Sequence, residues 1–494
     1  MTLLELMPFS VLVPLIAAPV CALLPGRFLP WLLTLLSALA SAVIAAFVLP
    51  QAMDAPLSYA FGNWPPPIGI EYRVDGANAF VALLVSGMAV LATLWGRKSV
   101  NDELGERQGV FYSLFLLALA GLMGITLTGD AFNVFVFLEI SSLSTYALIA
   151  HGADRRALLA SFRYLIMGTV GATFFLIGVG FLYIMTGTLN MADLAERLPE
   201  VADTRTVQVA LAFIIVGMSL KLAMLPLHMW LPNAYTYAPN FITVFVAGTA
   251  TKVALYVMIR MIFTVFGADY SYAVLPLTAV FLALALAGMF IGAWTAIFQA
   301  NLKRMLAWSS ISQVGYMLLG LGLGTMAGLT ATFLHLFNHA LIKAALFMAV
   351  GTVAWQVGSV RIEAFRGLGR QMPWTMTAFA LAGLSIIGIP TTAGFISKWY
   401  LILAAMDAGQ AWLVALIVIS SLMAVVYVWK VVEAAWFQNR PAGAETVSEA
   451  PLALLVPLWL VVGLNFWFGL DTRLPVAGAT AAAEALFGST GVAP

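Results

Sequence analysis

The chain has 494 residues, of which 62% are hydrophobic and only 9% are charged, and its net charge is +1. So much apolar surface excludes a water-soluble fold, and the lack of a basic tract argues against a nucleic-acid partner. The single cysteine, Cys21, excludes an internal disulfide and any cysteine-ligated zinc or iron–sulfur cofactor within the chain, so we expect no cofactor.

Apolar segments of about 20 residues follow one another along the chain, each long enough to cross a hydrocarbon core roughly 30 Å thick. A backbone in lipid must satisfy its own hydrogen bonds, so these segments are expected to be helices. The sequence therefore predicts an all-α polytopic membrane protein in which residues 1–494 form one integral domain. We expect about 14 spans, at residues 5–24, 29–49, 76–96, 110–128, 130–150, 158–187, 206–225, 240–265, 273–298, 303–323, 327–355, 375–405, 411–437 and 451–470.

Two loops have recognisable patterns. Residues 51–75 contain FGNWPPPIGIEYRVDG, in which the prolines and the following alternation predict a turn and a short hairpin. Residues 188–205 predict a short amphipathic helix at the surface. Neither loop is long or polar enough to separate two soluble domains.

Basic residues are concentrated in one set of loops. The loops after odd-numbered spans contain Arg27, Arg97, Lys98, Arg107, Arg155, Arg156, Lys303, Arg304, Arg361, Arg366, Arg370 and Arg440. The loops after even-numbered spans and the C-terminal tail contain Arg73, Arg197, Arg205 and Arg473. The positive-inside rule then places the first set in the cytoplasm, and an even number of spans places both termini on the outer side.

Several ionisable side chains fall inside the expected spans, where one charge costs about 2.5–3.5 kcal/mol or more. They are Glu139, Lys221, Lys252, Lys343, Lys398 and Lys430, together with His335 and His339. A lysine near a helix end can extend to the headgroups, which suits Lys430 and also accommodates Lys252. Glu139 is too short to do so. Its expected role is functional, and a purely structural ion pair is the alternative.

An acid and a lysine buried in one apolar bundle have charge states that depend on each other, as proton transfer requires. In FLHLFNHALIKAALF, His335, His339 and Lys343 are spaced at i, i+4 and i+8 and line one stripe of a helix. The stripe predicts a proton relay. A two-histidine metal site and histidines bonded only to neighbouring helices are the alternatives, and we expect no metal.

Two of the expected helices are interrupted beside a lysine. Pro226 and Pro232 follow Lys221, and Pro390 and Gly394 precede Lys398. Proline removes a backbone hydrogen bond, and the freed groups must be buried in protein or face a wet cavity. Interrupted spans beside ionisable residues are typical of transporter sites, and a structural kink is the alternative for each break.

The two halves of the chain resemble each other. Lys221 and Lys252 are 31 residues apart, and Lys398 and Lys430 are 32 apart. The offset between Lys221 and Lys398 pairs Glu139 with Tyr316. We therefore expect two five-helix repeats, spans 4–8 at residues 110–265 and spans 9–13 at residues 273–437, each with one broken helix. Because five is odd, consecutive repeats are inverted in the membrane.

Six segments resemble the signature segments of the antiporter-like subunits shared by complex I, the proton-pumping NADH:quinone oxidoreductase, and the Mrp-type multisubunit Na⁺/H⁺ antiporters. They are FVFLEISSLSTYALIA, KLAMLPLHMWLPNAYTYAP, VAGTATKVALYVMIR, NLKRMLAWSSISQVGYM, FNHALIKAALFMAVG and GIPTTAGFISKWYLI. By its length and by GFISKWYL, the chain most resembles the D-type subunit of the Mrp antiporters. The M-type subunit of complex I usually has glutamate at the position of Lys398, which argues against that type. The L-type subunit has an extended C-terminal lateral helix that this sequence does not show, which argues against that type as well. The N-type subunit and hydrogenase subunits remain open.

The resemblance implies a role for each matching residue. Glu139 corresponds to the fifth-helix glutamate that pairs with the seventh-helix lysine, here Lys221. Lys252 corresponds to the connecting lysine of the eighth helix, and Lys398 to the terminal lysine of the twelfth. The remaining candidates are His335 and His339 at the bridging histidine position, His228 beside the seventh-helix break, and Lys343, which is added from spacing alone.

These expectations describe a proton-translocating subunit of a multisubunit cation/proton antiporter that exports a monovalent cation, Na⁺ by resemblance, in exchange for H⁺. Its partners are other antiporter subunits and the lipid bilayer, and its location is a bacterial inner membrane. It is a secondary transporter subunit and not an enzyme. The alternatives are a proton-pumping subunit of a redox complex, a structural spacer and a stand-alone drug transporter.

Overall fold

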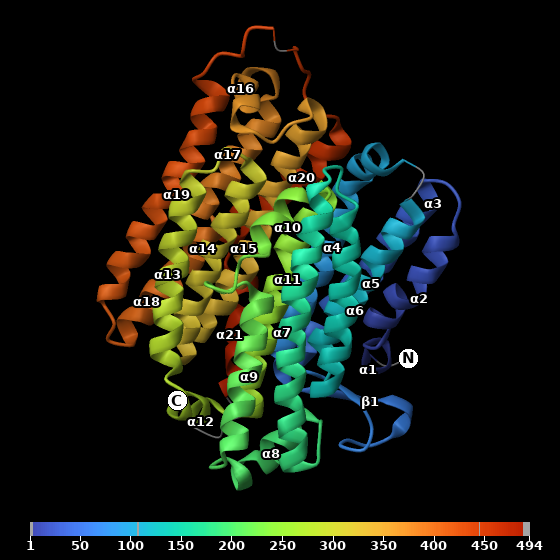
Figure 1. The fold of residues 1–494 in the computed structure, drawn as a ribbon, viewed down its shortest axis with the longest axis vertical. Coiled ribbons are helices and arrows are strands. Elements are labelled where there is room, and N and C mark those ends of the chain that lie inside the picture. The colour runs from blue at the N-terminus through green and yellow to red at the C-terminus, as the bar shows by residue number, and fades with distance from the viewer. Residues whose placement is uncertain (1–2, 106–107, 444, 488–494) are drawn as a thin grey trace.

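The computed structural model describes residues 3–105, 108–443 and 445–487. Arg107, one of the basic loop residues above, lies outside this part of the chain. The described chain is a bundle of long helices that run roughly parallel or antiparallel to one another (Figure 1). The prediction of an all-α polytopic membrane protein is confirmed.

The helices follow the order of the expected spans. Their bounds are α1 (Leu3–Leu6), α2 (Phe9–Leu23), α3 (Phe28–Asp54), α4 (Gly76–Leu104), α5 (Gln108–Leu127), α6 (Ala131–Ala150), α7 (Arg156–Thr186), α8 (Met191–Val201), α9 (Arg205–Leu222), α10 (Leu231–Tyr237), α11 (Asn240–Arg260), α12 (Ala268–Val274), α13 (Leu277–Ile297), α14 (Leu302–Gly322), α15 (Met326–Val357), α16 (Leu368–Gln371), α17 (Pro373–Ile387), α18 (Ala393–Asp407), α19 (Trp412–Trp436), α20 (Leu452–Leu470) and α21 (Arg473–Phe487). A π-helical turn, η2 (Met261–Val265), extends α11, and two short 3₁₀ turns are η1 (Phe61–Asn63) and η3 (Ile362–Phe365).

Within the described residues, 12 helices are long and apolar enough to cross a membrane. The two other expected spans coincide with α14 and with the α17–α18 pair. The buried face of α14 carries Ser309, Ser310, Ser312 and Gln313, which lower its apolar character. The pair consists of two 15-residue pieces, each too short to cross alone. The total of 14 spans therefore stays a prediction.

Both loop predictions match the structure. Strands β1 (Leu57–Ala60) and β2 (Glu71–Val74) form an antiparallel hairpin in which Leu57 pairs with Val74. In α8, the side chain of Asn190 accepts hydrogen bonds from two backbone amides of the first turn, which starts the helix.

The C-terminal segment is a helix where the sequence analysis recognised only a tail. Helix α21 packs against α4 and α15. The contact is close: a side chain on Gly478 would collide with the ring of Phe80. Its sequence, RLPVAGATAAAEALF, is rich in alanine, so it lacks the continuous large apolar run that identified the other helices.

Both expected breaks are present. Helix α9 ends at Leu222, and the chain passes through Pro226 before α10 begins. Helix α17 ends at Ile387, and Pro390 lies in the turn before α18. Gly388 joins the break at φ +90°, a left-handed conformation that glycine adopts without strain.

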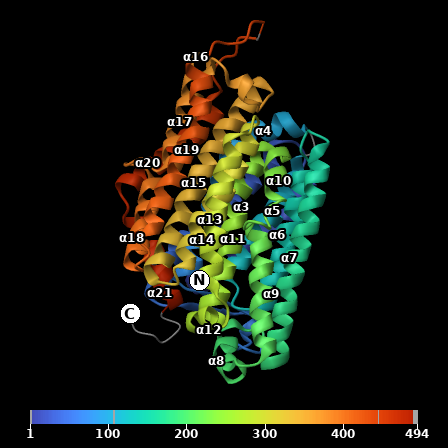
Figure 2. The same cartoon turned by 60° about the vertical axis from the view of Figure 1, so that its left-hand side comes forward.

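Two blocks of helices share the same order of neighbours. In α5, α6, α7, α9 and α11, each helix packs against the next, and the last packs against the first. The same holds for α13, α14, α15, the α17–α18 pair and α19. Figure 2 shows α13, α14 and α15 side by side. This shared order supports, as a proposal, the two repeats expected from the lysine spacing.

Helix α1 and the end of α21 lie in the half of the bundle that also carries β1, α8 and α12, whereas α16 lies at the opposite end (Figure 1). The first and last described helices are therefore on one side of the bundle, as an even number of spans requires. Which side faces the cytoplasm stays a prediction from the basic loops.

Candidate functional site

Glu139 and Lys221 lie at one interface between α6 and α9. The ammonium of Lys221 is buried and donates to Ser142 Oγ at 2.7 Å and to Tyr146 OH at 3.4 Å. These partners lie one and two helical turns beyond Glu139, on the same face of α6. The carboxylate interacts electrostatically with Lys221, and its buried Oε1 has no hydrogen-bond partner among the described residues. The two opposite charges are thus close without a direct ion pair.

The break after α9 holds Lys221 in place. Lys221 is in the last turn of α9, and Trp230 from the broken segment donates its indole N–H to the carbonyl of Leu220 at 2.8 Å. The ring of Tyr164 stacks on Trp230, with centroids 3.9 Å apart. The interrupted segment therefore packs back against the turn of α9 that carries Lys221.

A small cavity leads from Lys221 toward α11. Its volume is about 30 Å³, which is room for water. Ser141, Ser142 and Thr145 line one side together with Lys221, and Ala250 and neighbouring residues of α11 line the other. Hydroxyl groups around such a space can hold a water molecule between Lys221 and the helix that carries Lys252.

Lys252 is completely buried, and its ammonium donates to the carbonyl of Ala247 within its own helix. The side chain therefore does not extend to the headgroups, and the snorkelling alternative does not apply. Electrostatic interactions link Lys252 to both His335 and His339 on the adjacent α15. The helices thus bring the three groups together, although they are far apart in sequence.

The two histidines form a stack. Their rings are parallel within 4°, with centroids 5.9 Å apart. His335 shares a hydrogen bond with Ser397 Oγ at 2.9 Å, and Ser397 immediately precedes Lys398. Both nitrogens of His339 and Nε2 of His335 lack a partner among the described groups. Buried imidazole nitrogens without partners can accept or pass protons, directly or through water.

Lys398 completes the series on α18. Its ammonium donates at 2.9 Å to the carbonyls of Ile386 and Ile387 and to Ser421 Oγ. The two carbonyls belong to the last turn of α17, where the helix dipole is negative and stabilises a cation. The break between α17 and α18 therefore creates the binding position for the lysine.

Tyr316 of α14 lies between His335 and Lys398. The ammonium is 4.9 Å from the tyrosine ring centroid, and the His335 ring is 5.6 Å from it. Tyr316 is the residue that the repeat offset pairs with Glu139. In the second block it lies against the broken-helix lysine, as Glu139 does in the first.

Lys343 and His228 lie apart from this series. Lys343 reaches from α15 to α14, where its ammonium donates to the carbonyl of Leu306 at 2.7 Å and to Ser309 Oγ at 2.5 Å. It still interacts electrostatically with Lys252 and His339. His228 packs its ring 5.1 Å from Trp308, and no described contact joins it to the other candidates.

Sequence analysis missed the hydroxyl groups that bond to the lysines and to His335, namely Ser142, Tyr146, Ser309, Ser421 and, for His335, Ser397. Ser142 and Tyr146 could have been found from their helical spacing after Glu139. The others come from helices whose packing no local pattern reveals. No cluster of three or more His, Cys, Asp or Glu side chains suited to a metal ion occurs among the described residues.

Two further charges have structural partners. Lys430 is partly exposed and donates to the carbonyls of Ile297 and Gln299 at the end of α13. Arg260 forms two hydrogen bonds to Asp75, at 2.7 and 2.8 Å, and ties α11 to the start of α4. Burial acts to raise the pKa of Asp75, but Arg260 and the backbone amides of Ala77 and Asn78 together outweigh it and hold that pKa below its usual value.

Residues 128–424 match a family described as NADH:quinone oxidoreductase/Mrp antiporter, TM. The chain belongs to this family. The match covers more than half of the chain and includes every candidate residue from Glu139 to Lys398.

Relatives from two kinds of complex support the assignment. The chain is 43% identical to the N-type subunit of NADH-quinone oxidoreductase from Desulforudis audaxviator, over 92% of this chain and 93% of the relative. It is 31% identical to the D-type subunit of the Na⁺/H⁺ antiporter from Alkalihalophilus pseudofirmus, over 83% and 82%.

Chains of two solved membrane complexes have the same fold. A chain of the archaeal membrane-bound sulfane sulfur reductase superposes with a TM-score of 0.89 at 34% identity, covering 97% of both chains. A chain of the Mrp complex from a Dietzia species superposes with a TM-score of 0.91 at 27% identity, covering 99% of this chain and 98% of that one. The resemblance to the antiporter-like subunits is confirmed, and the chain is a multi-pass membrane protein.

Proposed function

We propose that this chain translocates protons through a line of buried groups contributed by α6, α9, α11, α15 and α18. The line runs from Glu139 and Lys221 through Lys252 to His335 and His339, and ends at Lys398. The observation that carries the proposal is the burial of these lysines and histidines with hydroxyl, carbonyl or imidazole partners and with no carboxylate ion pair among the described residues. A purely structural charge in a membrane would be expected to have such a counter-ion.

The partners explain how a proton would move. Each lysine ammonium is bonded to neutral oxygens, which stabilise the charged form less than a carboxylate does. Loss of a proton from one lysine changes the field at the next, because charges in this low-dielectric interior are poorly screened. Protonation of Glu139 would in this way alter Lys221, and then Lys252 and the histidines.

The chain works inside a multisubunit membrane assembly, as its relatives do. We propose that a redox reaction in partner subunits drives it, because the higher identities, 43% and 34%, are to subunits of complexes named for redox reactions. An Mrp-type cation/proton antiporter, the function expected from the motifs, is the second candidate. The superposition on the Mrp complex over 99% of this chain favours it.

Proton movement in everted membrane vesicles that contain the complete complex distinguishes redox-driven transport from cation/proton antiport. We expect proton movement on addition of the electron donor of the partner subunits, with no dependence on Na⁺, K⁺ or Li⁺. Cation-dependent proton movement without any electron donor would instead establish the antiporter. The absence of proton movement under both conditions would contradict the proposed function.

A further inference from the structure

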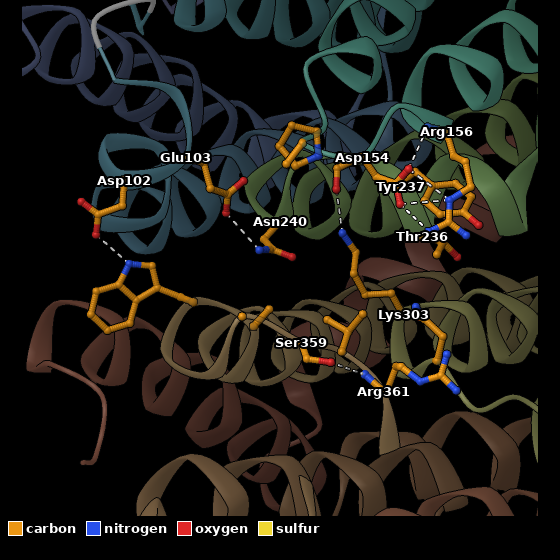
Figure 3. Close-up of a pocket in the computed structure, with 18 residues that line it drawn as sticks. Asp102, Glu103, Asp154, Arg156, Thr236, Tyr237, Asn240, Lys303, Ser359 and Arg361 are labelled. Atoms are coloured by element: carbon orange, nitrogen blue, oxygen red, sulfur yellow. Dashed lines mark hydrogen bonds and ion pairs between the residues drawn. The ribbon is translucent and has the colours of Figure 1, made fainter. Parts of the chain in front are cut away.

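A cavity of about 690 Å³ opens among the ends of α4 and α15 and several basic loops, and Figure 3 shows the residues that line it. The end of α4, the joint between α10 and α11, the start of α14 and the end of α15 surround it. These elements come from both helix blocks, so the cavity lies at their boundary. None of the candidate residues described above lines it.

Most charged side chains around this cavity have hydrogen-bond or ion-pair partners. Asp102 accepts the indole N–H of Trp355 at 2.7 Å, and Glu103 accepts from Asn240 at 3.0 Å (Figure 3). Asp154 pairs with Arg156. These groups make a polar wall that water can wet.

Lys303 differs from these side chains because it is buried and its ammonium bonds to a backbone carbonyl. It is in the first turn of α14, and only 4% of its surface is exposed, although it lines the cavity. Its ammonium donates to the carbonyl of Ala238 at 2.6 Å, and no ion pair joins it to a carboxylate within the described ranges. Glu103 on the opposite wall acts on it electrostatically. The sequence alone had placed Lys303 among the ordinary loop charges.

A row of groups continues inward from Lys303 along α14. Leu306 and Ser309 lie one and two turns further along this helix. Their carbonyl and hydroxyl oxygens are the two acceptors of the Lys343 ammonium. Lys343 is fully buried and interacts electrostatically with Lys252 and His339 of the proposed line. The structure therefore places one lysine at the cavity wall and a second between that wall and the middle of the bundle.

We infer that Lys303 exchanges protons between water in this cavity and the proposed line, with Lys343 as the next group inward. This inference rests on the proposed function. In one direction the neutral Lys303 amine takes a proton from a hydronium ion in the cavity, so that an O–H bond breaks and an N–H bond forms. The resulting ammonium then passes one proton, through water near the Ser309 hydroxyl, to the neutral amine of Lys343, and Lys303 returns to its neutral form.

The competing explanation is a structural role. Ala238 follows the last turn of α10, so the Lys303 ammonium also caps a helix C-terminus. Lys430 has the same kind of role at the end of α13, where it faces no part of this cavity. Lys430 is therefore a matched control for a lysine that only caps.

Arginine separates the two explanations, because it keeps the charge and the donors but does not release a proton in proteins. In the complete complex we expect Lys303→Arg to slow proton transport about tenfold or more, and Lys430→Arg to leave it near the wild-type rate. Wild-type transport by an assembled Lys303→Arg complex would overturn the inference while leaving the proposed function intact. Absence of transport in the wild type would overturn both.

Chemical rescue gives a second, independent test. Lys303→Cys introduces a thiol that cavity water should make accessible, whereas the native Cys21 is buried. We expect aminoethyl methanethiosulfonate, which attaches a titratable amine, to restore transport. The trimethylammonium analogue, whose charge is permanent, should not restore it. Equal rescue by both reagents, or no reaction with either, would contradict a proton-exchanging Lys303.

Discussion

Replacement of Lys221 by alanine is expected to slow proton transport by about 100-fold or more in the assembled complex. The substitution removes the ammonium that bonds to Ser142 and Tyr146 and that acts on Glu139. It also removes one of the side chains that line the small cavity leading to α11. The measurement is the initial rate of proton movement in vesicles, normalised to the amount of assembled complex.

Lys430→Ala is the matched control. Lys430 is a lysine of the same bundle, but it is partly exposed and donates only to carbonyls at the end of α13. It should keep most of the wild-type rate. Lys221→Arg adds information on mechanism: a large loss means that Lys221 must release its proton, whereas retained transport means that a fixed charge is sufficient. Wild-type transport by an assembled Lys221→Ala complex would contradict a role in the pathway.

Lys398→Ala is also expected to slow proton transport by about 100-fold or more in the assembled complex. The alanine removes the group that follows His335 in the line, across Ser397 and Tyr316. It also leaves the carbonyls of Ile386 and Ile387 without their donor, so assembly must be measured together with transport.

Ser421→Ala separates these two consequences. It removes one of the three hydrogen bonds of Lys398 but keeps the ammonium and both carbonyl contacts. We expect only a few-fold loss, consistent with about 1 kcal/mol for one hydrogen bond. A loss as large as that of Lys398→Ala would show that the geometry at Ser421, and not the charge of Lys398, limits the rate.

The sequence predicted the fold well because lipid imposes strong local rules. Long apolar runs identified the helices, and Pro226 and Pro390 identified both breaks. Helix α21 was missed because burial against α4 and α15 needs small residues, which leave no long hydrophobic signal. The exact number of spans is open for a similar reason, since the polar face of α14 is buried in protein and not in lipid.

The candidate site was predicted in part. The lysines, Glu139 and the histidines were candidates because charged and titratable residues are rare in an apolar sequence. The repeat offset paired Glu139 with Tyr316 but assigned Tyr316 no role. Their order in space could not be derived, because it depends on contacts such as His335 to Ser397 between distant helices. Lys303 was misjudged for the opposite reason: its neighbours in sequence resemble a surface loop, but α10 and the cavity walls bury it.

The central claim is that protons cross from one helix block to the other through Lys252, which is fully buried and lies between Lys221 and the histidines. The most direct test is the rate of proton movement by Lys252→Met in the assembled complex, since methionine keeps a long unbranched side chain without an ionisable group. The account predicts that transport falls to background although the complex assembles normally. Transport at the wild-type rate in this variant would contradict it.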